Sequence, residues 1–253
     1  MGRRRSVLVL VCVLFCAGCD ERSDGVPPGS VEASPAPFDD GRGCPIDDSL
    51  PSLPSVAGCI TAADGDADGD GSMETFVVYS RVDTDRIPRD WFIRVERSDG
   101  SVVEEIHLGP RADYQRVLGA ADIQGDGTDE WLVVTRNLAG HGAAWRELSL
   151  YVMVANDLRV VTLEKQPIRL FVGGVSRTGE GVACRNGRLQ LLRAEAQNIR
   201  NTRWDTSTRT YSIDGARARL LRRETAELSL SDYNDPDLDP FFSLLCGNVR
   251  YTP

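Results

Sequence analysis

The sequence of 253 residues predicts an all-β fold, because three hairpin-like segments recur about 57 residues apart and no long segment has helical periodicity. In each segment an Asp-Gly or Asn-Asp pair separates alternating apolar residues, which is the pattern of a β-hairpin. The three segments are RVERSDGSVV (94–103), YVMVANDLRV (151–160) and TRTYSIDGARARL (208–220). The short segments 192–198 and 224–230 are the only helix candidates.

Each repeat is expected to contain a lead-in strand, a loop, a second strand and the hairpin. In the second repeat these strands are 115–121, 130–136, 147–155 and 158–164. Four strands in a repeat of this length are typical of a propeller blade, and closed propellers have about four to eight blades. The sequence therefore predicts three four-stranded, blade-like repeats in a partial or open β-propeller, alone or closed by a second copy. A β-sandwich is the alternative.

The N-terminal region has the features of an export signal. Three arginines at positions 3–5 precede an apolar segment, 6–15, which is shorter than the roughly 20 residues that span a bilayer. Small residues before Cys19 resemble the lipobox of bacterial lipoproteins, although Cys16 stands where that family usually has leucine. The resemblance implies a signal peptide over 1–18, a lipid on the Cys19 thiol, and attachment to the extracytoplasmic face of the cell membrane. A plain secretory cleavage nearby is the alternative.

The mature chain divides into a tether and a folded domain. Residues 19–43 are rich in proline, glycine, serine and acids, so they cannot bury enough apolar surface to fold and are expected to be flexible. Residues 44–253 form the expected β-repeat domain. Removing 1–18 removes three arginines and no acid, so the formal charge changes from −9 to −12. An acidic exported domain is a poor partner for nucleic acid and favours cations.

The cysteine count predicts two disulfides. Four cysteines remain after cleavage and lipidation: Cys44, Cys59, Cys184 and Cys246. An even number in an oxidising compartment indicates disulfides, and three pairings are open. We favour Cys44–Cys59 and Cys184–Cys246, because each pair would link adjacent or terminal segments. The two CxxC pairs of a zinc site do not occur.

Two acidic loops, 66–74 and 122–130, match at an offset of 56 residues. Both have oxygen-bearing side chains at positions 1, 3, 5 and 9, and a glycine at position 6 that permits a sharp turn. Calcium prefers six to eight oxygen ligands at about 2.3–2.6 Å, and the residue at position 7 would add its backbone carbonyl. The candidate calcium ligands are Asp66, Asp68, Asp70, Ser72 and Glu74 in this first aspartate loop and Asp122, Gln124, Asp126, Thr128 and Glu130 in the second. Asp129, at position 8, is expected to point outward; acidic loops without a metal are the alternative.

The spacing of these loops resembles a known repeat family. An EF-hand needs a bidentate glutamate at position 12, where this chain has Val77 and Val133. The ninth-position acid followed directly by a strand resembles the FG-GAP or VCBS repeats of integrin alpha-type propellers. The resemblance covers the first two repeats, about 110 residues, and implies that calcium binds in a loop joining two blade strands.

The third repeat lacks the acidic ligands. At an offset of 54, Ser176 and Thr178 replace acidic or amide side chains, and Cys184 falls where Glu74 and Glu130 fall. This alignment predicts that a Cys184–Cys246 disulfide restrains the third loop in place of calcium.

Enzymatic motifs do not occur in the sequence. There is no HExxH, GxSxG or P-loop, and His107 and His141 are the only histidines. We therefore expect no enzyme but a calcium-stabilised binding or scaffold module of the cell envelope, with an unidentified envelope protein or glycan as its partner. An envelope polysaccharide hydrolase using carboxylates in a cleft is the alternative, and a purely structural envelope protein is the third hypothesis.

Overall fold

A computed structural model describes residue 53 and the segments 57–82, 88–110, 115–140, 143–198, 200–231 and 235–253. All of these belong to one compact unit, residues 33–253. The predicted signal peptide, Cys19, the tether to residue 43, Cys44 and His141 lie outside the described residues. The described residues therefore belong to the expected β-repeat domain alone.

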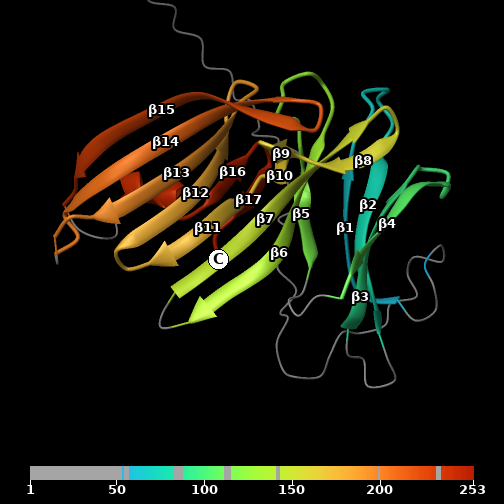
Figure 1. The fold of residues 1–253 in the computed structure, drawn as a ribbon, viewed down its shortest axis with the longest axis horizontal. Helices are drawn as coiled ribbons and strands as arrows, with labels where there is room; N and C mark the ends of the chain where they lie inside the picture. The colour runs from blue at the N-terminus through green and yellow to red at the C-terminus, as the bar shows by residue number, and fades with distance from the viewer. Residues whose placement is uncertain are drawn as a thin grey trace, which may run out of the picture. The chain divides into compact units, whose positions relative to one another are not determined.

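The first repeat forms its own antiparallel sheet, in the order β1-β2-β3-β4 (Figure 1). Its strands are β1 (Ala57–Gly65), β2 (Glu74–Val82), β3 (Pro88–Glu96) and β4 (Val102–Gly109). The predicted hairpin is the β3–β4 turn, where Gly100 has a φ of 80°, a conformation that costs glycine little. The all-β prediction is confirmed, and the first repeat has the four expected strands.

The second and third repeats share one 13-stranded sheet, so three separate four-stranded sheets are not formed. Within the second repeat, strand β7 pairs with β6 and, over residues 151–154, with β8. It also pairs with β11, where Leu148 lies opposite Leu170, and this pairing joins the second repeat to the third. The second repeat comprises β5 (Arg116–Ala121), β6 (Glu130–Gly140), β7 (Ala143–Val154) and β8 (Asp157–Val160). The third comprises β11 (Leu170–Val175), β12 (Thr178–Cys184), β13 (Leu189–Ala196), β14 (Arg203–Asp214) and β15 (Arg217–Ser229).

The remaining elements are short. They are β9 (Thr162–Leu163), β10 (Gln166–Pro167), the 3-10 helix η1 (Pro236–Phe241), β16 (Leu244–Cys246) and β17 (Val249–Tyr251). The two helix predictions are wrong: 192–198 falls mainly in β13 and 224–230 in β15, because pairing with β14 overrides their weak local preference. No helix in the described part of the chain has the length and apolarity needed to cross a bilayer.

Strand β6 is apolar on both faces because it separates two cores. Trp131 and Val133 face the first sheet, where the Trp131 ring stacks on Phe76 with centroids 4.8 Å apart. Leu132 and Val134 point to the opposite face and join the larger core. Successive side chains of a strand alternate between its two faces. One face of residues 131–134 therefore packs strands β5–β8 against the first sheet, and the other face packs them against the third repeat.

The C-terminal segment packs against β12 and β5. Strand β16 runs parallel to β12 with Cys246 opposite Cys184, and the predicted disulfide joins them. Beside β17, a Cβ added at Gly119 would lie 2.7 Å from a methyl group of Val249, so only glycine fits there. Cys59 is also disulfide-bonded.

Candidate cation site

The first aspartate loop connects β1 to β2 and is folded by its own carboxylates. Asp66 accepts hydrogen bonds from the backbone N–H groups of Gly69 (2.8 Å) and Gly71 (3.0 Å). Both glycines have positive φ, 76° and 86°, which other residues adopt only with strain. Asp70 accepts from the N–H of Ser72 at 2.7 Å. The turn therefore uses aspartate oxygens in place of backbone carbonyls, as Asx turns do.

Three of the predicted ligands converge in this loop. Asp66, Asp68 and Glu74 each offer a carboxylate oxygen, and these oxygens lie within 4.8 Å of one another. Among the described residues this is the one group of three acidic, histidine or cysteine side chains with that geometry. Glu74 is buried at the start of β2, where one oxygen accepts from the N–H of Ala67 at 2.9 Å. Burial raises the pKa of Glu74, and the charges of the neighbouring aspartates raise it further.

The other two predicted ligands of the first loop are not part of this group. Asp70 is exposed, and its hydrogen bonds from Ser72 lower its pKa. The N–H and side chain of Ser72 bind Asp70, and the expected role of the Ser72 carbonyl as a ligand stays a prediction. A cation held by the three converged carboxylates would reduce the repulsion among them, which is the physical reason for regarding this loop as a cation site.

The second aspartate loop connects β5 to β6 with the same backbone scheme. Asp122 accepts from the N–H groups of Gly125 (2.6 Å), Asp126 (3.1 Å) and Gly127 (3.1 Å). Asp126 accepts from both the N–H and the hydroxyl of Thr128. Gly125 and Gly127 again have positive φ. The predicted repeat of the loop conformation is therefore confirmed at an offset of 56 residues.

Glu130 in the second loop has donors for both of its oxygens. One oxygen accepts from the N–H of Ile123 at 2.7 Å, as Glu74 does from Ala67, and the other accepts from the side-chain amide of Gln124 at 2.8 Å. Glu130 has no solvent exposure, and burial raises its pKa to about 7. The amide of Gln124 thus supplies locally a hydrogen-bond donor that Asp68 cannot supply at the same position of the first loop.

The two loops bind each other through Asp129, which the sequence analysis placed in solvent. Its carboxylate accepts from the N–H of Asp66 at 3.0 Å, and its own N–H donates to the carbonyl of Asp66 at 2.7 Å. Burial raises the pKa of Asp129. The prediction of an outward side chain was wrong because the first repeat packs directly beside this position. Met73 occupies the same position in the first loop and is 56% exposed.

The disulfide lies at the end of β12 that is far from the third-repeat turn. Ser176 begins the turn between β11 and β12, whereas Cys184 ends β12, so the alignment of Cys184 with Glu74 and Glu130 is wrong. Gly187, in the turn after Cys184, lies against the second loop: a Cβ added there would lie 2.5 Å from the carbonyl oxygen of Gln124. The disulfide therefore holds the end of β12, and the turn that contains Gly187 follows directly from that end.

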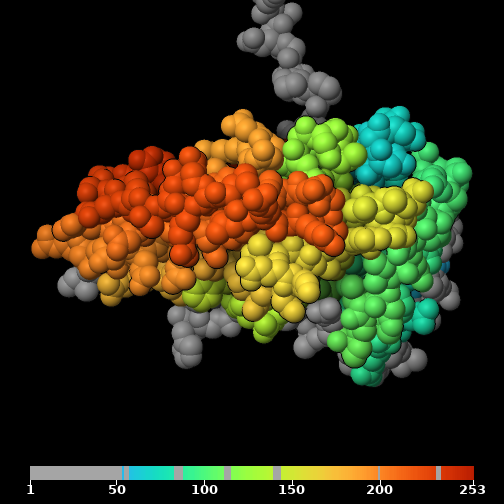
Figure 2. Space-filling view, turned by 45° about the horizontal axis from the view of Figure 1, so that its top comes forward, coloured from blue at the N-terminus to red at the C-terminus, as the bar shows by residue number. Residues whose placement is uncertain are grey.

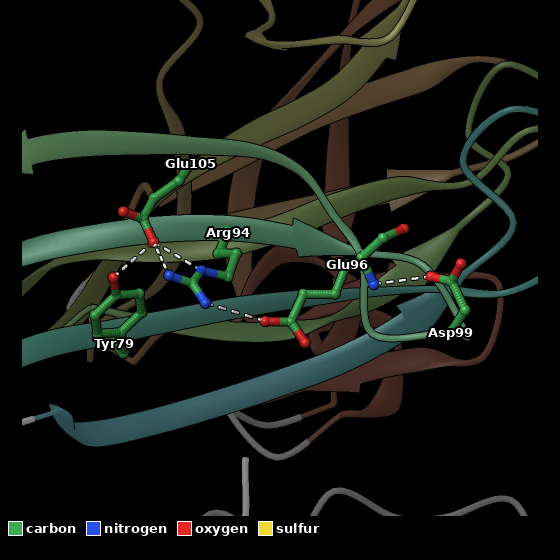
Figure 3. Close-up of polar contacts among 6 residues, drawn as sticks. Tyr79, Arg94, Glu96, Asp99 and Glu105 are labelled. Carbon is green, nitrogen blue, oxygen red and sulfur yellow. Dashed lines mark hydrogen bonds and ion pairs between the residues drawn. The ribbon is translucent and has the colours of Figure 1, made fainter. Parts of the chain in front are cut away.

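A second polar cluster, missed by the sequence analysis, crosses three strands of the first sheet (Figure 3). Glu105 accepts hydrogen bonds from the Tyr79 hydroxyl at 2.8 Å and from Arg94 Nε at 2.7 Å, and Arg94 also pairs with Glu96 at 3.5 Å. Burial would raise the pKa of Glu105, but the hydrogen bonds from Tyr79 and Arg94 outweigh it and the pKa is lowered. Burial and Glu105 raise the pKa of Tyr79 to about 12.

This cluster is best explained as a structural ion-pair network. Alternation along β2, β3 and β4 could have placed its members on one face, but only the register brings Tyr79, Arg94 and Glu105 together. In the β3–β4 turn nearby, Asp99 accepts from the N–H of Ser101 (Figure 3).

No protein-family model matches the sequence, and no curated protein shows significant similarity to it.

Proposed function

We propose that the first aspartate loop binds Ca²⁺ and that the second binds it more weakly. The observation that supports this is the convergence of the Asp66, Asp68 and Glu74 carboxylates in a turn closed by two left-handed glycines. Calcium suits such a site, because it accepts several carboxylate and carbonyl oxygens in flexible geometry. Gln124 replaces one of the three anions in the second loop, and a neutral amide attracts a cation less strongly.

The matched substitutions Glu74→Gln and Glu130→Gln test this assignment. Each replaces the carboxyl group at position 9 with a neutral amide and retains an oxygen that can accept from the loop backbone. We expect calcium to raise the melting temperature of the wild-type protein, with little effect of magnesium. Glu74→Gln should abolish most of that increase, and Glu130→Gln should preserve most of it. Equal melting curves of the wild-type protein in calcium and in chelator would refute calcium binding.

We further propose that calcium has a structural role in a blade-like module. Each aspartate loop joins the first two strands of an antiparallel meander, and the first sheet stacks on β5–β8 through a shared apolar core. These features support a blade-like arrangement of the first two repeats in a partial or open propeller. Bound calcium would hold the loops that connect the strands, leaving the sheet faces rigid.

The module is proposed to be a lipid-anchored binding or scaffold protein of the cell envelope. The arginines at 3–5, the short apolar segment and Cys19 support export and lipid attachment. The rigid β surface would then bind an envelope protein or glycan. Mass spectrometry of the mature N-terminus tests the anchor: a diacylglycerol mass on Cys19 is expected, and an unmodified N-terminus elsewhere would rule it out. Capture of partners in calcium, compared with chelator, tests the binding role.

A further inference from the structure

Within the described part of the chain, strand β15 has an edge that other strands leave mostly uncovered. Residues 219–227 are exposed along their whole length, on both faces of the sheet, and Figure 2 shows this segment at the surface. One edge of β15 pairs with β14; on the other edge, the described residues provide only a single bridge, Arg217 opposite Thr162. Leu221 is an extra residue that bulges the strand, and 222–229 continue without a further irregularity. An unpaired edge of this kind is a template for another strand.

The charges on this edge are incompletely matched within the chain. Arg223 lies opposite Arg209 of β14, and it makes no ion pair or hydrogen bond within the described residues. Glu227 uses one carboxylate oxygen for Arg203, at 2.7 Å. Arg223 and Glu227 point to the same face because they are four residues apart in a strand. The edge therefore carries an unpaired cation and a carboxylate with a free oxygen.

We propose that two copies of this chain pair through β15, antiparallel, with Thr225 at the two-fold axis. When a two-fold axis perpendicular to the sheet relates two identical antiparallel strands, each side chain stays on the same face of the joined sheet. One residue of the strand then lies on the axis, opposite the same residue of the partner subunit. Centring on Thr225 places Arg223 opposite Glu227 of the partner subunit, twice, and uses only residues 222–228. The pair of threonines and the two opposite-charge pairs are both favourable cross-strand neighbours.

The other symmetric registers within 222–227 are less favourable. An axis at Arg222, Arg223, Glu224 or Glu227 places like charges directly opposite, which destabilises the pairing. An axis at Ala226 makes no ion pair. Thr225 and Glu227 also line an open groove of about 510 Å³ over β13–β15, so the Thr225 register would join the grooves of two copies across the axis.

Cysteine substitution in the full-length chain tests the register. Thr225→Cys should give a disulfide-linked dimer on mild oxidation, because side chains at the axis lie about 5 Å apart. Ser229→Cys is the matched control, since its two copies would be separated by about 27 Å at roughly 3.4 Å per residue. Peptide mass spectrometry would identify the linked positions. No linkage at position 225, or equal linkage at both positions, would overturn the proposal.

Charge exchange gives an independent test by analytical ultracentrifugation. Arg223→Glu should weaken dimerisation about tenfold or more, because it places two glutamate pairs across the axis. The double variant Arg223→Glu with Glu227→Arg should recover wild-type dimerisation, and Arg219→Glu should leave it unchanged. A wild-type protein that stays monomeric, or a double variant no better than the single, would refute this register. Melting curves show whether each charge variant is folded. The Thr225→Cys cross-linking test does not depend on these variants.

Discussion

The two aspartate loops have the same backbone conformation but balance their charges differently. In both loops, the aspartate at position 1 accepts hydrogen bonds from the N–H groups of two glycines. The glutamate at position 9 accepts one from the N–H of the residue at position 2. At position 3 the first loop has Asp68, which adds a third carboxylate, and the second has Gln124, whose amide donates to Glu130. One substitution therefore distinguishes a loop with three converging carboxylates from one that supplies its own hydrogen-bond donor.

This difference shows that the loop conformation does not depend on the number of carboxylates that converge in it. The glycines, the first aspartate and the ninth-position glutamate recur in both loops with the same hydrogen bonds, so the turn does not depend on which residue stands at position 3. The attraction for a cation depends on how many uncompensated carboxylates converge, which position 3 controls. The loops also differ in their neighbours, because the turn that contains Gly187 packs against the second loop.

The disulfide provides the largest expected effect and acts on the second loop's support. Replacing Cys184 and Cys246 together by serine should lower the free energy of unfolding by about 2–5 kcal/mol, because the bond closes a long chain segment. Denaturant titrations with calcium and with chelator measure the loss in each condition. Calcium should stabilise the variant as much as the wild-type protein; a lost calcium response would contradict the assignment of calcium to the first loop.

Burial of Glu130 predicts a pH dependence of stability. Its pKa rises from 4.5 in the unfolded chain to about 7 in the fold, so the folded state retains a proton that the unfolded state releases. Stability should therefore fall as pH rises from about 4.5 to 7, by up to about 3 kcal/mol. Unfolding of wild-type and Glu130→Gln proteins in chelator at pH 5 and pH 8 measures this. A parallel pH dependence of the two proteins would show that Glu130 does not cause it.

Gln124→Asp should make the second loop resemble the first. The substitution removes the donor to Glu130 and adds a carboxylate, so we expect a loss of about 1–3 kcal/mol in chelator. Calcium should reverse the loss and bind the second loop more tightly, which calorimetric titration would show. Asp68→Gln is the reciprocal variant and should weaken calcium binding at the first loop. If neither substitution changes calcium binding, position 3 does not distinguish the loops.

Asp129→Ala should give a small loss of stability, about 1 kcal/mol, because it removes a partly buried hydrogen bond from Asp66. Met73→Ala changes the same position of the first loop, where the side chain is mostly exposed, and should change stability by less than about 0.5 kcal/mol. Thermal melts in chelator compare the two variants. Equal effects would indicate that the contact between the loops contributes little.

Much of the fold and part of the site follow from local sequence patterns. All three predicted hairpins form, because a tight turn and its flanking alternation are fixed by neighbouring residues. The turns of the second and third hairpins are Ala155-Asn156 and Gly215-Ala216, each one residue away from the predicted Asn-Asp or Asp-Gly pair. The conformation of both aspartate loops was predictable for the same reason, since the hydrogen bonds of Asp66 and Asp122 stay within five residues. The Cys184–Cys246 pairing was favoured among three, and the structure confirms it.

Tertiary structure decided what local patterns cannot encode. The pairing of β7 with β11 merged two repeats into one sheet, and packing between repeats turned Asp129 inward to bind Asp66. The same packing placed the turn after Cys184 against the second loop. The sequence by itself determined the turns and the alternation, because those depend on residues a few positions apart. Sheet continuity and loop support depend on segments tens of residues apart, and only the folded chain brings them into contact.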